Sequence, residues 1–147
     1  MYAIKRIALS FILFSPVLAC AASGIVVQTE REMYEECSAF SQAGMRECLA
    51  KKAEDSQMAL QQAEKKVVSA LSKWFEEDKY IKESKAKFAA ANKEFIRYRN
   101  AQCAFGSSLS GGGAGSVREI GRLGCVTELN NRRAQQLLDA VSTVRAR

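Results

Sequence analysis

Apolar residues recur along most of the chain at steps of three and four, which is the spacing of one face of an α-helix. A first series runs through residues 45–74, a second through residues 81–103, and a third through residues 117–144, after a glycine-rich stretch. None of them shows sustained alternation of apolar and polar positions, so we expect no β-sheet. The pattern predicts a mainly α-helical domain of about three main helices, preceded by a short N-terminal segment.

Residues 45–105 contain neither glycine nor proline. One unbroken helix over this stretch would be about 90 Å long, whereas a compact domain of this size has a radius of gyration of about 14 Å. We therefore place a break at the acidic residues 76–78, where the Asp78 carboxylate can cap the next helix. A single long exposed helix or an extended hairpin remains the alternative. Residues 106–115 predict a flexible connector between the last two helices.

The N-terminal residues predict export. Lys5 and Arg6 precede an apolar stretch at residues 7–18, and small residues follow at 19–22. This order is typical of a signal peptide, which we assign to residues 1–21, leaving one helical domain at residues 22–147. A second interpretation is that residues 17–20, VLAC, form a lipobox, in which case lipidation of Cys20 would anchor the protein to a membrane. The expected location is the periplasm or the exterior, with lipoprotein anchoring as the alternative.

Both interpretations leave four cysteines, Cys37, Cys48, Cys103 and Cys125. An even number in an exported chain predicts two disulfides, and the sequence separations do not suit a zinc site. Four cysteines allow three connectivities, of which we favour 37–48 with 103–125. On one continuous helix Cys37 and Cys48 would be about 16 Å apart, and a disulfide requires about 7 Å or less. Their pairing therefore needs a chain reversal, for which Ser41 is a candidate N-cap.

The composition argues against catalysis. The 147 residues include 22 Lys+Arg, 16 Asp+Glu and no histidine, which excludes histidine-dependent acid–base chemistry, nucleophile activation and metal binding. No helix places two carboxylates on a clearly apolar face, and we expect no free thiol, no metal and no cofactor. Positive charge is concentrated late in the chain: residues 30–79 hold 11 acidic and 8 basic side chains, and residues 80–147 hold 5 and 12. An exported chain without interleaved aromatics in its basic half is not expected to bind nucleic acid.

Several short runs resemble a known family. They are MREC at residues 45–48, FIRYRNAQC at 95–103 and CVTEL at 125–129, with Cys37 before them and Arg133 after them. This arrangement, over roughly residues 34–140, resembles the LprI-type lysozyme inhibitor family of small, helical, disulfide-bonded bacterial envelope proteins. The chain departs from the usual family pattern at Phe95, Asn100 and Gln102, where Trp, Asp and Glu are more common.

The resemblance implies a protein that binds a protein partner and inhibits lysozyme by occluding its cleft. The candidate contact residues are Tyr98, Arg99 and Arg133. Each of the two arginines has a guanidinium group, which can bind a carboxylate through two hydrogen bonds. The competing interpretation is that both arginines pair with acidic residues of neighbouring helices, and that Phe95 and Tyr98 lie in the core or at its edge. The alternative function is a periplasmic adaptor or immunity-like protein. The net charge of about +4 that remains without Lys5 and Arg6 (20 basic and 16 acidic residues) favours it, since a basic inhibitor is not steered toward a basic lysozyme.

Two further expectations concern local structure. Trp74 ends an apolar series and is expected in the core. Thr127 and Glu128 are expected at the start or in the first turn of the third main helix, where a carboxylate is stabilised by the helix dipole.

Overall fold

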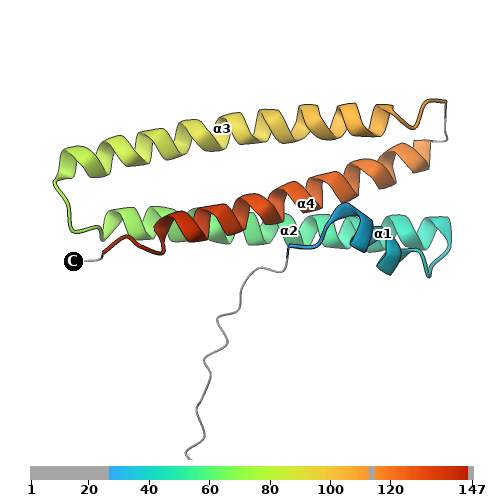
Figure 1. Ribbon diagram of the computed structural model, residues 1–147, viewed down its shortest axis with the longest axis horizontal. Helices are drawn as coiled ribbons and strands as arrows, with labels where there is room; N and C mark the ends of the chain where they lie inside the picture. Colours follow the sequence, from blue (N-terminus) through green and yellow to red (C-terminus); the bar gives the residue numbers. More distant parts are fainter. Residues whose placement is uncertain (1–26, 113–114, 146–147) are drawn as a thin grey trace, which may run out of the picture.

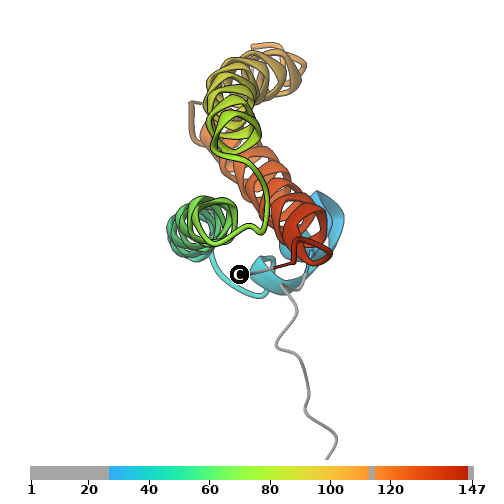
Figure 2. The ribbon, with the colours of Figure 1, turned by 90° about the vertical axis from the view of Figure 1, so that its left-hand side faces the viewer.

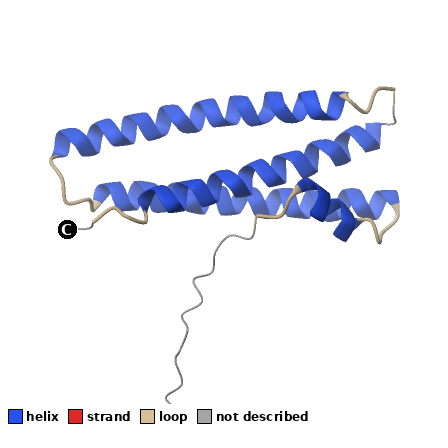
Figure 3. Cartoon of the chain, in the orientation of Figure 1, coloured by secondary structure: helices blue, strands red, loops and turns tan. Residues whose placement is uncertain are grey.

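The computed structural model describes residues 27–112 and 115–145, and in these ranges it contains four helices and no strand. They are α1 (Glu30–Cys37), α2 (Gln42–Ser72), α3 (Asp78–Ser108) and α4 (Gly115–Val141), shown in Figures 1 and 3. The mainly helical fold was predicted, but the number of helices is four rather than about three. The segment assigned to export, including Cys20, lies outside the described residues.

The additional helix is α1, an eight-residue segment that is too short to show a helical period in the sequence. Thr29 begins it with a reciprocal capping arrangement: its hydroxyl accepts from the backbone N–H of Glu32 (3.3 Å), and the Glu32 carboxylate accepts from the backbone N–H of Thr29 (2.7 Å). Such a cap satisfies two backbone donors at once. Met33 and Cys37 are then the two buried residues of α1.

The breaks between helices agree only in part with the expectation. Ser41 caps α2 by accepting from Gly44 N, as predicted. The break before α3 also occurs, but its N-cap is Glu77, which makes no side-chain capping bond, and Asp78 is already the first helical residue. The connector is shorter than expected, because α3 continues through Gly106 to Ser108 and α4 begins at Gly115. In this connector Gly111 has a φ of +59°, which explains why glycine is needed there.

The helices form an open arrangement in which α4 is the central element. Figures 1 and 2 show α4 running obliquely, close to α3 at its start and close to α2 at its end. Of the 31 residues of α3, only Ile81 and Cys103 are buried. This helix is therefore held by one narrow face, and most of its surface is exposed. No helix in the described ranges has the length and apolar character needed to cross a membrane.

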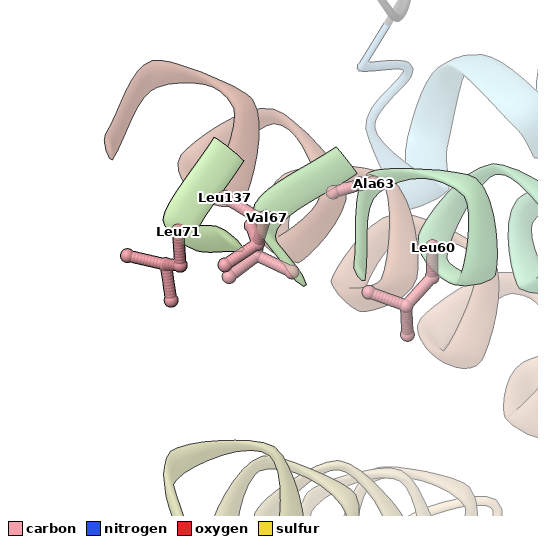
Figure 4. Close-up of a cluster of buried hydrophobic side chains, with 6 residues drawn as sticks. Leu60, Ala63, Val67, Leu71 and Leu137 are labelled. Carbon is pink, nitrogen blue, oxygen red and sulfur yellow. The ribbon is translucent and has the colours of Figure 1, made fainter. Parts of the chain in front are cut away.

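The core consists of two separate clusters. The larger one packs Leu60, Ala63, Val67 and Leu71 of α2 against Ala134 and Leu137 of α4, as Figure 4 shows for the labelled side chains. Trp74, Phe88 and Phe95 are partly buried against this cluster, so the core placement expected for Trp74 and Phe95 is confirmed. The smaller cluster joins α1 to the beginning of α2 and to α4: Met33, Cys37, Leu49, Ile120 and Leu123.

The two disulfides each connect two helices. Cys37 is bonded to Cys48 across the α1–α2 turn, with 5.8 Å between Cα atoms. Cys103 is bonded to Cys125, with 5.6 Å between Cα atoms, and joins α3 to α4. This is the connectivity that the sequence analysis favoured. Because α3 has only one other buried residue, the second disulfide fixes the end of α3 to the rest of the domain.

Candidate functional site

Arg99 lies at the point where α2, α3 and α4 meet. Its Nη1 donates to Asn130 Oδ1 on α4 (2.8 Å) and to Gln57 Oε1 on α2 (3.1 Å). Asn130 is fully buried and donates in turn to Ser56 Oγ on α2 (3.2 Å). One arginine of a largely exposed helix therefore connects all three long helices through a polar network.

Arg133 lies on α4, close to the same place. Its Nη2 donates to Asn92 Oδ1 on α3 (3.1 Å), while its Nε is buried and has no hydrogen-bond partner among the described residues. Both guanidinium groups lie near the Phe95 ring, with Cζ of Arg133 at 5.6 Å and Cζ of Arg99 at 6.0 Å from the ring centroid. These distances are in the range of cation–π contacts.

The partners of the two arginines differ from the expected ones. We considered carboxylates of neighbouring helices, but the acceptors are neutral amides, and no ion pair found among the described residues includes either arginine. Burial, followed by the positive charge of Arg122, lowers the pKa of Arg99 from its ordinary value, while Glu64 acts weakly in the opposite direction. An amide satisfies a guanidinium donor without cancelling its charge. The cluster therefore holds two positive charges that are in no ion pair with a described residue.

Tyr98 does not belong to this cluster. Its side chain is 55% exposed, so its expected position in the core or at the core edge is wrong. The reason is the narrow contact face of α3: Phe95 and Arg99 lie on that face, whereas Tyr98 is about 100° away from Arg99 around the helix. Of the three candidate contact residues, Arg99 and Arg133 come together around Phe95, and Tyr98 is presented to the exterior.

A groove lies beside the arginines, between α2 and α3. It has a volume of about 400 Å³ and is lined by Gln61, Glu64, Lys65, Val68, Phe88 and Asn92. Asn92 also accepts the hydrogen bond from Arg133, so it connects the groove to the arginine cluster. Phe88 and Val68 give the groove an apolar wall, and Val68 is 45% exposed.

A second hollow, of about 440 Å³, lies at the disulfide end of the molecule and is lined in part by Tyr34, Gln102 and Cys125. Here the Tyr34 hydroxyl donates to Glu30 Oε1 (2.7 Å), and the backbone N–H of Glu30 donates to Glu128 Oε2 (2.6 Å). Burial, followed by the hydrogen bond to Glu30, raises the pKa of Tyr34. The hydrogen bond between Glu30 and Glu128 fastens α1 to α4.

The position of Glu128 corrects a prediction. Since α4 begins at Gly115, Thr127 and Glu128 lie in its middle rather than in its first turn. Thr127 is buried and donates to Leu123 O (2.8 Å). Glu128 accepts from the backbone N–H at the start of α1 through one carboxylate oxygen and pairs with Arg132 of α4 through the other. The glycine-rich stretch hid this start, because Gly121 and Gly124 are helical here. The hydrogen bond from Glu30 to Glu128 is a tertiary contact with α1, so the sequence pattern of α4 alone could not predict it.

Charge is separated in space. The eight residues of α1 include four glutamates and one arginine, whereas α3 carries seven basic and three acidic residues. α1 packs against α2 and α4, and α3 lies on the other side of them in Figures 1 and 2. The molecule therefore has an acidic side at α1 and a basic side at α3.

The chain matches a protein-family model. The model described as "Lysozyme inhibitor LprI" matches residues 35–137, from the end of α1 to the end of the α2–α4 core. The chain belongs to the LprI lysozyme inhibitor family. Comparison with curated proteins and with solved structures gave no match. The LprI family is a family of inhibitors rather than enzymes. The matched range contains both disulfides and the arginine cluster.

Proposed function

We propose that this LprI-family protein is an exported envelope protein that inhibits a lysozyme by occluding its substrate cleft. The observation that carries the proposal is the family match over residues 35–137. The structure supports a binding role, because α3 is a long, disulfide-fixed helix whose outer side chains are not needed for the core. An inhibitor needs such a rigid, outward-facing surface, since ordering a flexible one would cost affinity.

We propose Tyr98 as the outer contact residue, with the positive charge behind it supplied by Arg99 and Arg133. Exposed tyrosines bury a large area at low entropic cost and are enriched among residues that dominate binding energy. Lysozyme catalysis depends on two carboxyl groups with tuned protonation states. A basic surface set against those groups is electrostatically favourable at short range even where the two proteins repel each other at a distance.

Export is part of the same proposal. Residues 1–21 would be removed as a signal peptide, releasing a domain of residues 22–147 to the periplasm or the exterior, and lipidation of Cys20 is the alternative. Mass spectrometry of the protein from an envelope fraction distinguishes the two processing routes, because only the second retains Cys20 and adds acyl mass.

The charge distribution favours a second candidate function, that of an adaptor or immunity-like protein for another envelope or secreted partner. A basic α3 would steer acidic partners rather than the most basic lysozymes. Pull-down from an envelope extract in the presence of excess lysozyme separates the two functions. If the protein is a lysozyme inhibitor, the excess lysozyme displaces its bound partners. If it is an adaptor, those partners stay bound.

Two tyrosines of α3 offer a matched test of the inhibitory surface. Tyr98 is 55% exposed and Tyr80 is 42% exposed, and 18 residues separate them, or about 27 Å along the helix. Tyr98→Ala is expected to raise the inhibition constant at least tenfold, and Tyr80→Ala less than threefold. Equal effects of the two substitutions would argue against Tyr98 as the contact residue.

A further inference from the structure

The groove between α2 and α3 contains polar groups that the fold does not use. Lys65 is in no ion pair with a described residue, and Asn92 accepts from Arg133 through Oδ1 while its Nδ2 makes no hydrogen bond to the described residues. The Gln61 side chain likewise makes no hydrogen bond within the described ranges, although all three residues line the groove. The groove therefore presents donors without acceptors.

The charge around these donors is positive. Arg133 lies directly behind Asn92 and has a buried Nε without a partner, and Arg99 lies beside it against Phe95. The groove lining itself holds one cation, Lys65, and one carboxylate, Glu64, so the two arginines next to it make the local balance positive. Neutral amides hold the arginines in place without cancelling their charge, so an anion in the groove would gain from both. A partly buried charge acts more strongly than an exposed one, because water screens it less.

The other wall of the groove is apolar. Phe88 is half-buried against the core, and Val68 is 45% exposed and lies opposite on α2. A volume of about 400 Å³ is within the range of small-ligand sites, which combine apolar walls with a few placed polar groups. An inorganic ion would leave this wall exposed to water, whereas a hydrocarbon group would cover it.

We propose that the groove between α2 and α3 is a binding site for a small organic anion with an apolar body. The carboxylate of the ligand accepts hydrogen bonds from Asn92 Nδ2 and Lys65 Nζ, in the field of Arg133. The hydrocarbon part of the ligand covers Val68 and Phe88. This site goes beyond lysozyme inhibition: Tyr98 does not line the groove, although both proposals use the charge of Arg133.

Sodium octanoate is a suitable probe, with octanamide as its uncharged counterpart. Titration of the isotopically labelled protein, followed by ¹H–¹⁵N spectra, is expected to shift the side-chain amides of Asn92 and Gln61 and the Nε–H of Arg133 in a saturable way. Octanamide is expected to bind at least tenfold more weakly, since a charge-assisted hydrogen bond is about twice as strong as a neutral one. Equal binding of the two probes would overturn recognition of the charge.

Neighbouring residues provide matched controls for the groove. Lys65→Gln is expected to weaken octanoate binding about threefold to tenfold, whereas Lys66→Gln, one position along the exposed surface of α2, is expected to leave it unchanged. Arg133→Gln is expected to weaken it about tenfold or more. Its control is Arg132→Gln, because Arg132 already pairs with Glu128 (2.5 Å). No saturable shift with octanoate, or equal losses within either pair of folded variants, would refute the site.

Discussion

Removal of the Asn130 side chain tests the polar network that joins the three long helices. Asn130 is fully buried, its Oδ1 accepts from Arg99 Nη1 at 2.8 Å, and its Nδ2 donates to Ser56 Oγ at 3.2 Å. Asn130→Ala leaves the half-buried Arg99 with one fewer acceptor, and a hydrogen bond to a charged group contributes about 1.5–3 kcal/mol. Ser56 keeps its bond to Ala53 O (2.7 Å), so no second group is orphaned. With a small cavity added, the expected loss of unfolding free energy is about 2–4 kcal/mol.

Urea denaturation measures this loss as a lower midpoint at an unchanged slope. The control is Asn131→Ala, the next residue of α4, which makes no hydrogen bond to the described residues and should cost less than about 0.5 kcal/mol. A double-mutant cycle of Asn130→Ala with Arg99→Met should give a coupling free energy of about 1–3 kcal/mol. A loss below about 1 kcal/mol together with zero coupling would refute the network as a link between the helices.

Three further predictions concern the packing of α1 and the disulfides. Gly124→Ala should destabilise the protein by about 1–2 kcal/mol in a urea titration, because the new Cβ would meet Glu30 Cγ at 3.0 Å and Tyr34 Oη at 3.2 Å. Gly121→Ala, whose nearest contact is at 3.7 Å, should stabilise the protein by up to about 1 kcal/mol. Burial raises the pKa of Tyr34 above its ordinary value of 10.0. The stability that this side chain contributes is therefore complete below about pH 10 and is lost as the pH rises further. Thermal melts of Tyr34→Phe at increasing pH should show a smaller alkaline loss of stability, and an unchanged loss would contradict the role given to Tyr34. Replacing Cys103 and Cys125 together by Ala opens a loop of 22 residues and should lower the free energy of unfolding, measured by calorimetry, by about 3 kcal/mol. No loss of stability would contradict the presence of this disulfide.

The sequence is sufficient to predict what depends on local pattern. The apolar steps of three and four place the long helices, the acidic residues before Asp78 mark the break, and Ser41 marks the start of α2. The eight residues of α1 were not predicted in this way, because two helical turns are too short to show an apolar period. Thr29 and Glu32, three residues apart, would nevertheless have indicated a capped helix. Gly106 is misleading because a glycine near a helix end usually stops it, and here the helix continues to Ser108.

The side-chain partners could not be predicted, because they depend on how the helices are rotated against one another. Arg99 and Asn130 are 31 residues apart and lie on different helices, so no spacing rule brings them together. An arginine in a helical protein is ordinarily expected to find a carboxylate, and the amide acceptors become evident only when α2, α3 and α4 are in place. The exposure of Tyr98 likewise depends on the narrow contact face of α3.

The central claim is inhibition of lysozyme by occlusion, and steady-state kinetics test it most directly. A panel of lysozymes is assayed on a soluble oligosaccharide substrate with the purified protein at micromolar excess, and the substrate concentration is varied. Occlusion of the cleft predicts that the apparent KM of at least one lysozyme rises with inhibitor while kcat stays constant. Full activity of every lysozyme in the panel would contradict the account.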